Sequence, residues 1–254
     1  MTVLAEVSFF ILGAIIASFV GVVVGRMHTG QSFVSGRSRC DACNTPLTFF
    51  SLVPILSFFI SRGHAQCCNA RISIFAPLTE ILLGGLFALV YLKLDLGYSL
   101  LSMLISLSVL LLLVLYDLLH QILPSAPLYL FVGMSALTGL LESGATVFFS
   151  ESLFIALCLA FVLAAIHFLS RGRAMGFADI PLVFGLALLV GKAAIPGFLF
   201  SFWIGAVVGI VLLVQRPRGS RMGVEVPFAP FLAAGFLLAY FTQWNLLTLI
   251  AVIQ

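Results

Sequence analysis

Long apolar stretches separated by short polar segments dominate the pattern along the chain. Helices of ~20 residues cross a hydrocarbon core ~30 Å thick, and the stretches reach that length, whereas the short alternating segments typical of transmembrane β-strands are absent. Eight spans are expected, at roughly 4–25, 74–93, 99–119, 126–141, 151–169, 179–191, 196–214 and 228–253. The sixth is short, and the eighth is expected to break near Gln243. The pattern predicts an all-α integral membrane protein with about eight transmembrane helices.

Composition supports this interpretation. The 254 residues are 62% hydrophobic and only 8% charged, with a mean hydropathy of +1.24, whereas a soluble domain carries roughly 25% charged residues. Lipid is therefore an expected partner. The net charge of +3 is small and its basic residues are scattered, which argues against nucleic acid. We expect a single polytopic domain over 1–254, with a soluble loop at 26–73 and a membrane core at 74–254.

The basic residues predict the orientation, because cytoplasmic loops carry an excess of Lys and Arg. Lys93 and Lys192 lie on one side of the predicted membrane. The other ten of the twelve basic residues lie on the opposite side: Arg26, Arg37, Arg39, Arg62, Arg71, Arg171, Arg173, Arg216, Arg218 and Arg221. This asymmetry places loop 26–73 in the cytoplasm and both termini outside.

Two aspartates lie at the same predicted depth and on the same side. Asp117 ends the third span after the uncharged run Leu100–Leu115, and Asp179 opens the sixth. Charges inside a membrane are costly and mark functional or paired positions. Two adjacent carboxylates share one proton, so that the ionised one can activate water while the protonated one donates to a carbonyl. Two other interpretations remain: an ion or proton site of a carrier, and a structural pair bonded to Arg171 or Arg173.

Other ionisable residues carry weaker signals. His120 follows Asp117 by three residues and so shares its helix face; it either contacts the site or is a solvated interfacial histidine. His28 and His167 belong to no recognisable constellation. Glu80, about one turn inside the second span, is either a third buried acid or, as we expect, paired with an arginine at the inner edge of the membrane.

The soluble loop is too short to bury a hydrophobic core of its own, and disulfides or a bound metal ion are needed to stabilise it. It holds four of the five cysteines: Cys40, Cys43, Cys67 and Cys68. Cytoplasmic thiols stay reduced, which favours a metal over disulfides, and a Cys-x-x-Cys pair can face one tetrahedral zinc ion. The adjacent Cys67 and Cys68 have poor spacing for a second pair because neighbouring side chains diverge. Three thiolates with His64, or free thiols, are the alternatives.

Several segments carry a family resemblance when they are taken in order. They are Ala17–Arg26, Cys40-x-x-Cys43, Leu52–Ser57, Arg62-Gly63, Ala70–Ile72, Pro77-x-x-Glu80, Asp117 with Pro124, Met175–Asp179 and Pro227–Phe231. Together these segments resemble the type IV prepilin leader peptidases, which are membrane aspartyl proteases of the GxGD type that mature type IV pilins and type II secretion pseudopilins.

The resemblance implies an enzyme of the bacterial inner membrane whose active site faces the cytoplasm. It would remove the short basic leader of a prepilin or pseudopilin after a glycine, with Asp117 and Asp179 as the catalytic pair and 74–254 as the peptidase core. Many members also methylate the new N-terminus with S-adenosylmethionine, for which no residue of this chain can be assigned.

Three positions depart from the family pattern. Ala178 replaces the glycine that usually precedes the second aspartate, which is tolerable if its φ is ordinary and costly if φ is positive. Pro181 replaces a common lysine, and Ala65 replaces the third cysteine. A non-catalytic scaffold of pilin assembly is therefore one alternative. A small-molecule or ion carrier is another, although no internal repeat supports it.

Overall fold

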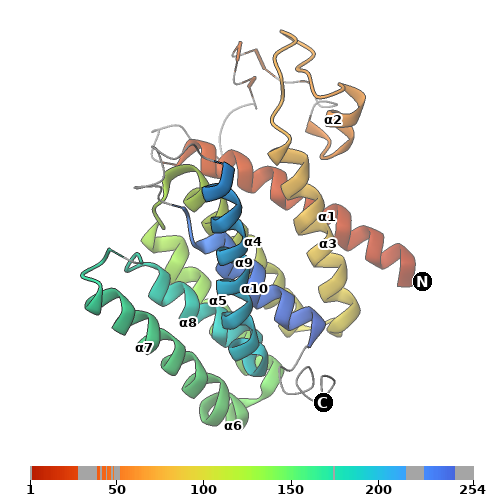
Figure 1. The fold of residues 1–254 in the computed structure, drawn as a ribbon. Coiled ribbons are helices and arrows are strands. Elements are labelled where there is room, and N and C mark those ends of the chain that lie inside the picture. The colour runs from red at the N-terminus through yellow and green to blue at the C-terminus, as the bar shows by residue number, and fades with distance from the viewer. Residues whose placement is uncertain are drawn as a thin grey trace, which may run out of the picture. The chain divides into compact units, whose positions relative to one another are not determined.

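The computed structural model describes residues 2–27, 39–40, 42–43, 45–46, 48, 52–173, 175–215 and 226–243. Within them the chain forms helices and two isolated β-bridges, and no strand (Figure 1). Six helical stretches of this part of the chain are long and apolar enough to cross a membrane. The predicted all-α, multi-pass membrane fold is confirmed, while the eight crossings and the orientation stay predictions. Arg37, Arg216, Arg218, Arg221 and residues 244–253 of the predicted eighth span lie outside the described residues.

The chain divides into two compact units, Met1–Leu100 and Leu101–Gln254. The first unit contains α1 (Thr2–Arg26), the short α2 (Leu56–Ile60) and α3 (Phe75–Lys93). Helices α1 and α3 pack closely because glycines face each other. A Cβ on Gly13 would lie 2.7 Å from the carbonyl oxygen of Leu83, and a Cβ on Gly84 would lie 2.8 Å from that of Phe10. Small residues allow the same close approach between helices in membranes generally.

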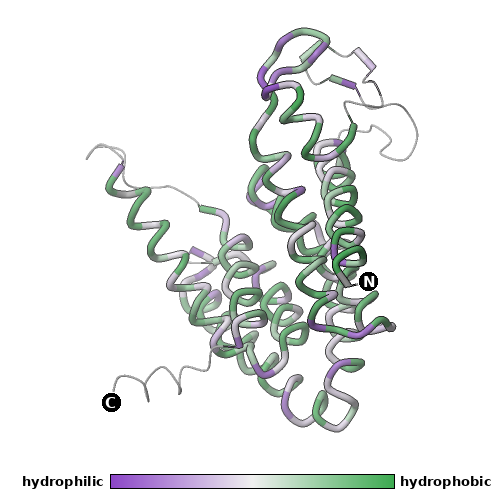
Figure 2. Tube along the Cα trace, turned by 90° about the vertical axis from the view of Figure 1, so that its right-hand side faces the viewer, coloured by the Kyte–Doolittle hydropathy of each residue, from purple (hydrophilic) through white to green (hydrophobic). Residues whose placement is uncertain are grey.

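The second unit holds the remaining helices. They are α4 (Tyr98–His120, which begins just before the boundary), α5 (Ser125–Ser143), α6 (Ala145–Val147), the π-helical turn η2 (Phe148–Ser152), α7 (Leu153–Leu169), α8 (Asp179–Val190), the 3₁₀ turn η3 (Gly191–Ala193), α9 (Ala194–Gln215) and α10 (Ala229–Thr242). Helix α10 ends where a break was expected, since Gln243 adopts left-handed backbone angles at its C-terminus. Figure 2 shows hydrophobic positions along the helices, with hydrophilic positions gathered mainly near their ends and in the turns.

Helix α8 is the most buried helix of the second unit. Nine of its 12 residues are buried, among them Asp179 and the run from Gly185 to Val190. It packs against α5, α7 and α10, and a Cβ on Gly185 would lie only 2.8 Å from the ring of Phe131. With 12 residues α8 is ~18 Å long, which is shorter than a hydrocarbon core of ~30 Å. Its burial explains why α8 is apolar on all sides.

Helices α9 and α10 pack through two glycines. A Cβ on Gly197 would lie 2.8 Å from Cα of Phe236, and a Cβ on Gly235 would overlap the backbone nitrogen of Ser201. The Ser201 hydroxyl donates to the carbonyl of Gly197 at 2.8 Å and is also 3.3 Å from that of Leu232. These contacts fix the position of α10, whose first residue reaches the candidate site.

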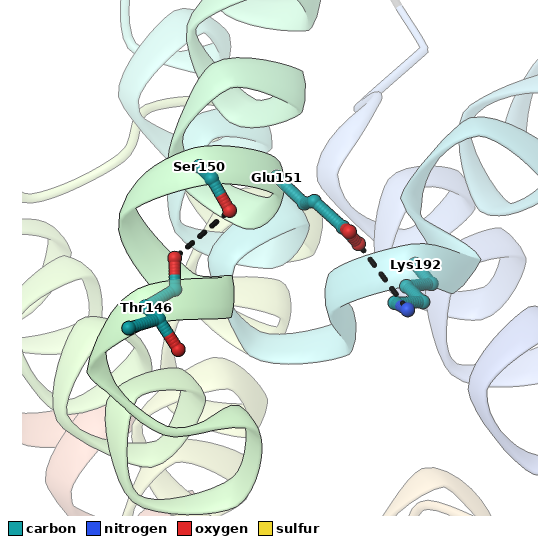
Figure 3. Close-up of polar contacts among 4 residues, drawn as sticks. All are labelled: Thr146, Ser150, Glu151 and Lys192. Atoms are coloured by element: carbon teal, nitrogen blue, oxygen red, sulfur yellow. Dashed lines mark hydrogen bonds and ion pairs between the residues drawn. The ribbon is translucent and has the colours of Figure 1, made fainter.

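The end of α8 remote from Asp179 carries a break and an ion pair. Gly191, with φ of 57°, ends α8 before α9 begins. Lys192 in η3 lies 3.2 Å from the carboxylate of Glu151 in η2, beside the hydrogen bond from the Ser150 hydroxyl to the Thr146 carbonyl (Figure 3). Both charged side chains are largely exposed, so this pair contributes little to stability.

Candidate active site and candidate metal centre

Asp117 lies near the C-terminal end of α4, at the N-terminus of α10. Its side chain is buried, and its Oδ2 accepts a hydrogen bond of 3.1 Å from the backbone N–H of Ala229. Ala229 is the first residue of α10 and is fully buried, and Pro230 follows it in the first turn. The N-terminus of a helix carries unpaired N–H groups and partial positive charge, both of which favour a carboxylate. The hydrogen bond and the helix N-terminus favour the ionised form of Asp117, whereas the burial of its side chain favours the protonated form.

Asp179 is the first residue of α8 and is held from the segment before it. Its Oδ2 accepts a hydrogen bond of 3.2 Å from the backbone N–H of Gly176, and its own N–H lies 3.3 Å from the carbonyl of Gly176. This reach back over three residues is the contact that the acidic residue of a capping box makes. A Cβ on Gly176 would lie 3.3 Å from Oδ2, so a residue without a side chain leaves room for the carboxylate.

The two aspartates come from helices far apart in the sequence and belong to the same unit. The negative charge of Asp117 acts electrostatically on Asp179, and both side chains are buried. Arg171 and Arg173 are exposed, and among the described residues neither forms an ion pair with either aspartate. Two buried carboxylates within one unit are the groups that acid–base hydrolysis by an aspartate pair uses.

The departures beside Asp179 cause no strain. Ala178 has φ of −70° and ψ of −16°, ordinary right-handed angles that an alanine adopts as readily as other residues. Pro181 is the third residue of α8, where its missing N–H removes no helical hydrogen bond. Both substitutions therefore fit the local backbone.

Two histidines border the site. The ring of His120 lies 4.4 Å from that of Tyr116, centroid to centroid, and His120 is exposed. His167, to which the sequence pattern assigned no role, lies at the end of α7 with Nδ1 2.8 Å from the carbonyl oxygen of Met175. Nothing in the sequence signals this contact, because it depends on how the segment before Asp179 turns back over α7.

The four loop cysteines come together in the first unit. Their sulfurs all lie within 4.8 Å of one another. Cys40 and Cys68 are 3.8 Å apart, Cys43 and Cys67 are 3.2 Å apart, and Cys67 and Cys68 are 3.9 Å apart. Tetrahedral Zn–S bonds of about 2.3 Å place sulfurs about 3.8 Å apart, so the thiols fit a tetrahedral ion.

The expectation that Cys67 and Cys68 would diverge is wrong. Backbone hydrogen bonds from Ala65 N–H to the Ala70 carbonyl and from Asn69 N–H to the Ala65 carbonyl fold this segment into a tight turn. Asn69 adopts φ of 57° there. The turn directs both sulfurs to one side. His64 is not among these clustered ligand atoms. Its Nδ1 lies 3.0 Å from the carbonyl oxygen of Arg62.

The electrostatic environment differs among the thiols. Hydrogen bonding to Thr45, whose hydroxyl lies 3.0 Å from the sulfur, lowers the pKa of Cys43 to about 6. Hydrogen bonding to Cys43 raises the pKa of Cys67 to about 12. A cation would favour the thiolate of both residues, since metal ligation requires deprotonated sulfur.

Glu80 is a third buried carboxylate, in the first unit. Its Oε2 accepts a hydrogen bond of 2.7 Å from the backbone N–H of Ile55. Ile55 has φ of 62° and ψ of −55°, and the N–H of Leu56 bonds the carbonyl of Pro54 at 2.6 Å. These are the angles of the strained γ-turn, which is rare for a β-branched residue. Glu80 thus joins α3 to the start of α2.

Comparison with known proteins identifies the family. The model of the bacterial peptidase A24 N-terminal domain matches residues 11–94. The prepilin leader peptidase/N-methyltransferase of Bacillus subtilis is 31% identical over 91% of this chain and 92% of its own length. The proteins of that name from Myxococcus xanthus and Neisseria gonorrhoeae are 32% and 27% identical, over 85% and 84% of this chain and 66% and 84% of theirs. No solved structure matches. The chain belongs to the prepilin leader peptidase/N-methyltransferase family.

Proposed function

We propose that this protein is an aspartyl endopeptidase that removes the short basic leader from type IV prepilins or type II secretion pseudopilins. The proposal rests chiefly on the buried carboxylates of Asp117 and Asp179, which come from two helices, are each bonded by a backbone N–H, and interact electrostatically. Family membership supports the same substrate class, because the relatives carry the name prepilin leader peptidase.

The proposed chemistry uses one proton shared by the pair. The ionised carboxylate takes a proton from water as the water attacks the scissile carbonyl, and the protonated carboxyl donates to the carbonyl oxygen. Collapse of the tetrahedral intermediate then returns a proton to the departing nitrogen. The N–H groups of Ala229 and Gly176 keep the two carboxylates in place and stabilise negative charge on either one.

The substrate must present unwound chain to this pair, since a helix already uses its carbonyls in its own hydrogen bonds. A prepilin meets this requirement where its basic leader joins its apolar helix. We place the cleaved bond after a glycine at the cytoplasmic face of the bacterial inner membrane, with both termini of the enzyme on the periplasmic side, as the distribution of basic residues predicts.

We further propose that Cys40, Cys43, Cys67 and Cys68 hold a structural zinc ion. Four thiolates form a closed set of ligands, which is typical of structural rather than catalytic zinc. The sulfur–sulfur distances of 3.8 and 3.9 Å support this assignment. N-methylation of the new N-terminus with S-adenosylmethionine is supported by the names of the relatives, and we assign no residue to it.

A cleavage assay tests the proposal. The full chain, in detergent or lipid, is mixed with a prepilin whose leader ends in glycine, and loss of the leader is followed by mass spectrometry. We expect cleavage by the wild type and a loss on the order of 10²–10⁴-fold in Asp117→Asn and in Asp179→Asn. Cleavage that survives either substitution contradicts the aspartate mechanism. Prepilin binding without cleavage by the wild type would favour a scaffold, and ion uptake into vesicles that depends on Asp117 and Asp179 would favour a carrier.

A further inference from the structure

His167 contacts the segment before Asp179 at several points. Its ring nitrogen Nδ1 is 2.8 Å from the carbonyl oxygen of Met175, and its ring lies 5.7 Å from that of Phe177, centroid to centroid, in a T-shaped contact. Its backbone carbonyl accepts the N–H of Gly172 at 2.9 Å. A Cβ on Gly172 would lie 3.4 Å from Cε1 of His167. His167, in α7, therefore contacts the connection between α7 and α8 near its beginning, at Gly172, and near its end, at Met175 and Phe177.

One peptide group links His167 to Asp179. A carbonyl oxygen can only accept a hydrogen bond, so Nδ1 of His167 carries the hydrogen. The Met175 carbonyl and the Gly176 N–H belong to the same peptide unit, and that N–H donates to Oδ2 of Asp179 at 3.2 Å. The chain of hydrogen bonds thus runs from the Nδ1–H of His167 to the carbonyl of Met175, and from the N–H of Gly176 to the carboxylate of Asp179. Hydrogen bonds in such a chain polarise one another and strengthen each other.

We propose that His167 is a positioning residue that fixes the Asp179 carboxylate through the Met175–Gly176 peptide. The inference rests on the proposed function, because the carboxylate it positions is half of the proposed catalytic pair. The imidazole keeps its Nδ1 hydrogen whether neutral or protonated, so the link holds in both states. Arg171 and Gly172, between α7 and α8, have φ of 53° and 72°, and no regular helix extends through them. Helical hydrogen bonds therefore do not hold this connection, and the contacts of His167 do.

Three substitutions separate the hydrogen bond from the space that the ring fills. In His167→Asn an amide N–H lies close to the position of Nδ1, and the donor is retained. In His167→Gln the amide N–H lies nearer to the position of Nε2, and the donor is misplaced. His167→Phe fills the space without a donor. Leu169→Ala, at an exposed position of the same helix end, controls for changes to α7 that leave the peptide link intact.

Cleavage kinetics provide the first test. We expect His167→Asn to keep kcat within about threefold of the wild type, and His167→Gln and His167→Phe to lower kcat by about 10- to 100-fold, because misplacing a catalytic group by 1 Å can cost ~10²-fold. KM for prepilin stays within about twofold in all three. Equal loss in the Asn and Gln variants, or a wild-type rate in His167→Phe, would overturn the inference.

Hydrogen exchange provides a second test that needs no activity. Mass spectrometry of the segment 170–179 in the full chain reports the protection of the Gly176 N–H. We expect faster exchange there in His167→Gln and His167→Phe, and wild-type protection in His167→Asn and Leu169→Ala. Unchanged protection in the Gln and Phe variants contradicts the inference. If the wild type fails to cleave prepilin, the proposed function fails, and exchange still decides whether His167 holds this peptide.

Discussion

The thiol cluster and the aspartate pair hold their reactive groups in different ways. Cys43, Cys67 and Cys68 are exposed, and their sulfurs contact one another across two short turns. Asp117 and Asp179 are buried, and each accepts a hydrogen bond from a backbone N–H, that of Ala229 at the start of α10 and that of Gly176 in the segment before α8. The positions of the thiols depend on local turns of the loop, whereas the positions of the carboxylates depend on how the helices pack. We therefore expect different substitutions to disrupt the thiol cluster and the aspartate pair.

The largest expected effect comes from the packing of α10. Gly235→Val introduces a side chain where even a Cβ overlaps the backbone of Ser201, and overpacking of this kind costs roughly 1–3 kcal/mol. The displaced α10 would withdraw the Ala229 N–H from Asp117. We expect a lower thermal unfolding midpoint and a loss of prepilin cleavage of about 100-fold or more. Gly209→Val, whose Cβ meets nothing within 4 Å, should keep both near wild type. If Gly235→Val cleaves normally, helix packing does not control the pair.

The next effect concerns the glycine beside Asp179. Gly176→Ala places a methyl group 3.3 Å from the carboxylate oxygen. A hydrogen bond to a charged group contributes about 1.5–3 kcal/mol, so partial loss should lower kcat by about tenfold or more. Ala178→Gly is the matched control. Its ordinary φ predicts a kcat within about twofold of wild type and a stability lower by about 0.4–1 kcal/mol. A kcat of Ala178→Gly that exceeds the wild-type kcat by more than about twofold would show that the alanine limits turnover.

A smaller effect is expected at Glu80. Glu80→Ala leaves the N–H of Ile55 without its acceptor, which costs roughly 1–3 kcal/mol if the group stays buried. We expect faster hydrogen exchange near Ile55 and a cleavage rate within about threefold of wild type. Glu80→Gln keeps an acceptor oxygen and should exchange at nearly the wild-type rate. A loss of cleavage comparable to that of Gly176→Ala would mean that Glu80 serves the active site.

The smallest effect on cleavage is expected from removal of the metal. Cys43→Ser or a strong chelator should abolish bound zinc, measured by elemental analysis of the purified chain, because a thiolate of the closed ligand set is lost. Cleavage should remain within about threefold of wild type, since the proposed chemistry uses only the aspartates. Cys158→Ser changes the one cysteine outside the cluster and should leave zinc unchanged. Wild-type protein without zinc would contradict the metal site.

Parts of both regions could be predicted from the sequence. The apolar stretches located the helices because the membrane requires each crossing segment to satisfy its own backbone hydrogen bonds. Asp117 was recognised as a candidate because its carboxylate lies at the end of an uncharged run, and Asp179 because its carboxylate lies at the start of a predicted span. The Cys-x-x-Cys spacing indicated a metal site, but the pattern failed for Cys67 and Cys68, where a turn with Asn69 at positive φ brings neighbouring sulfurs together.

The contacts that hold the carboxylates could not be predicted. The Ala229 N–H lies 112 residues from Asp117, and backbone donors carry no residue-type signal that a pattern can detect. The contact of His167 with this segment could not be predicted either, because its partner is the main-chain carbonyl of Met175, outside any regular helix. Only the packing of α10 and the position of the Met175–Gly176 peptide beside His167 bring these groups to the aspartates.

The sequence by itself determined that the chain is an all-α membrane protein, which residues could carry charge or metal, and which family motifs they form. Composition and periodicity encode these properties locally, because burial in lipid acts on each segment separately. The tertiary structure alone decided which backbone N–H groups hold Asp117 and Asp179 and how four thiols converge. Those relations depend on close helix contacts at residues such as Gly235 and on turn geometry, both of which arise only when distant segments pack together.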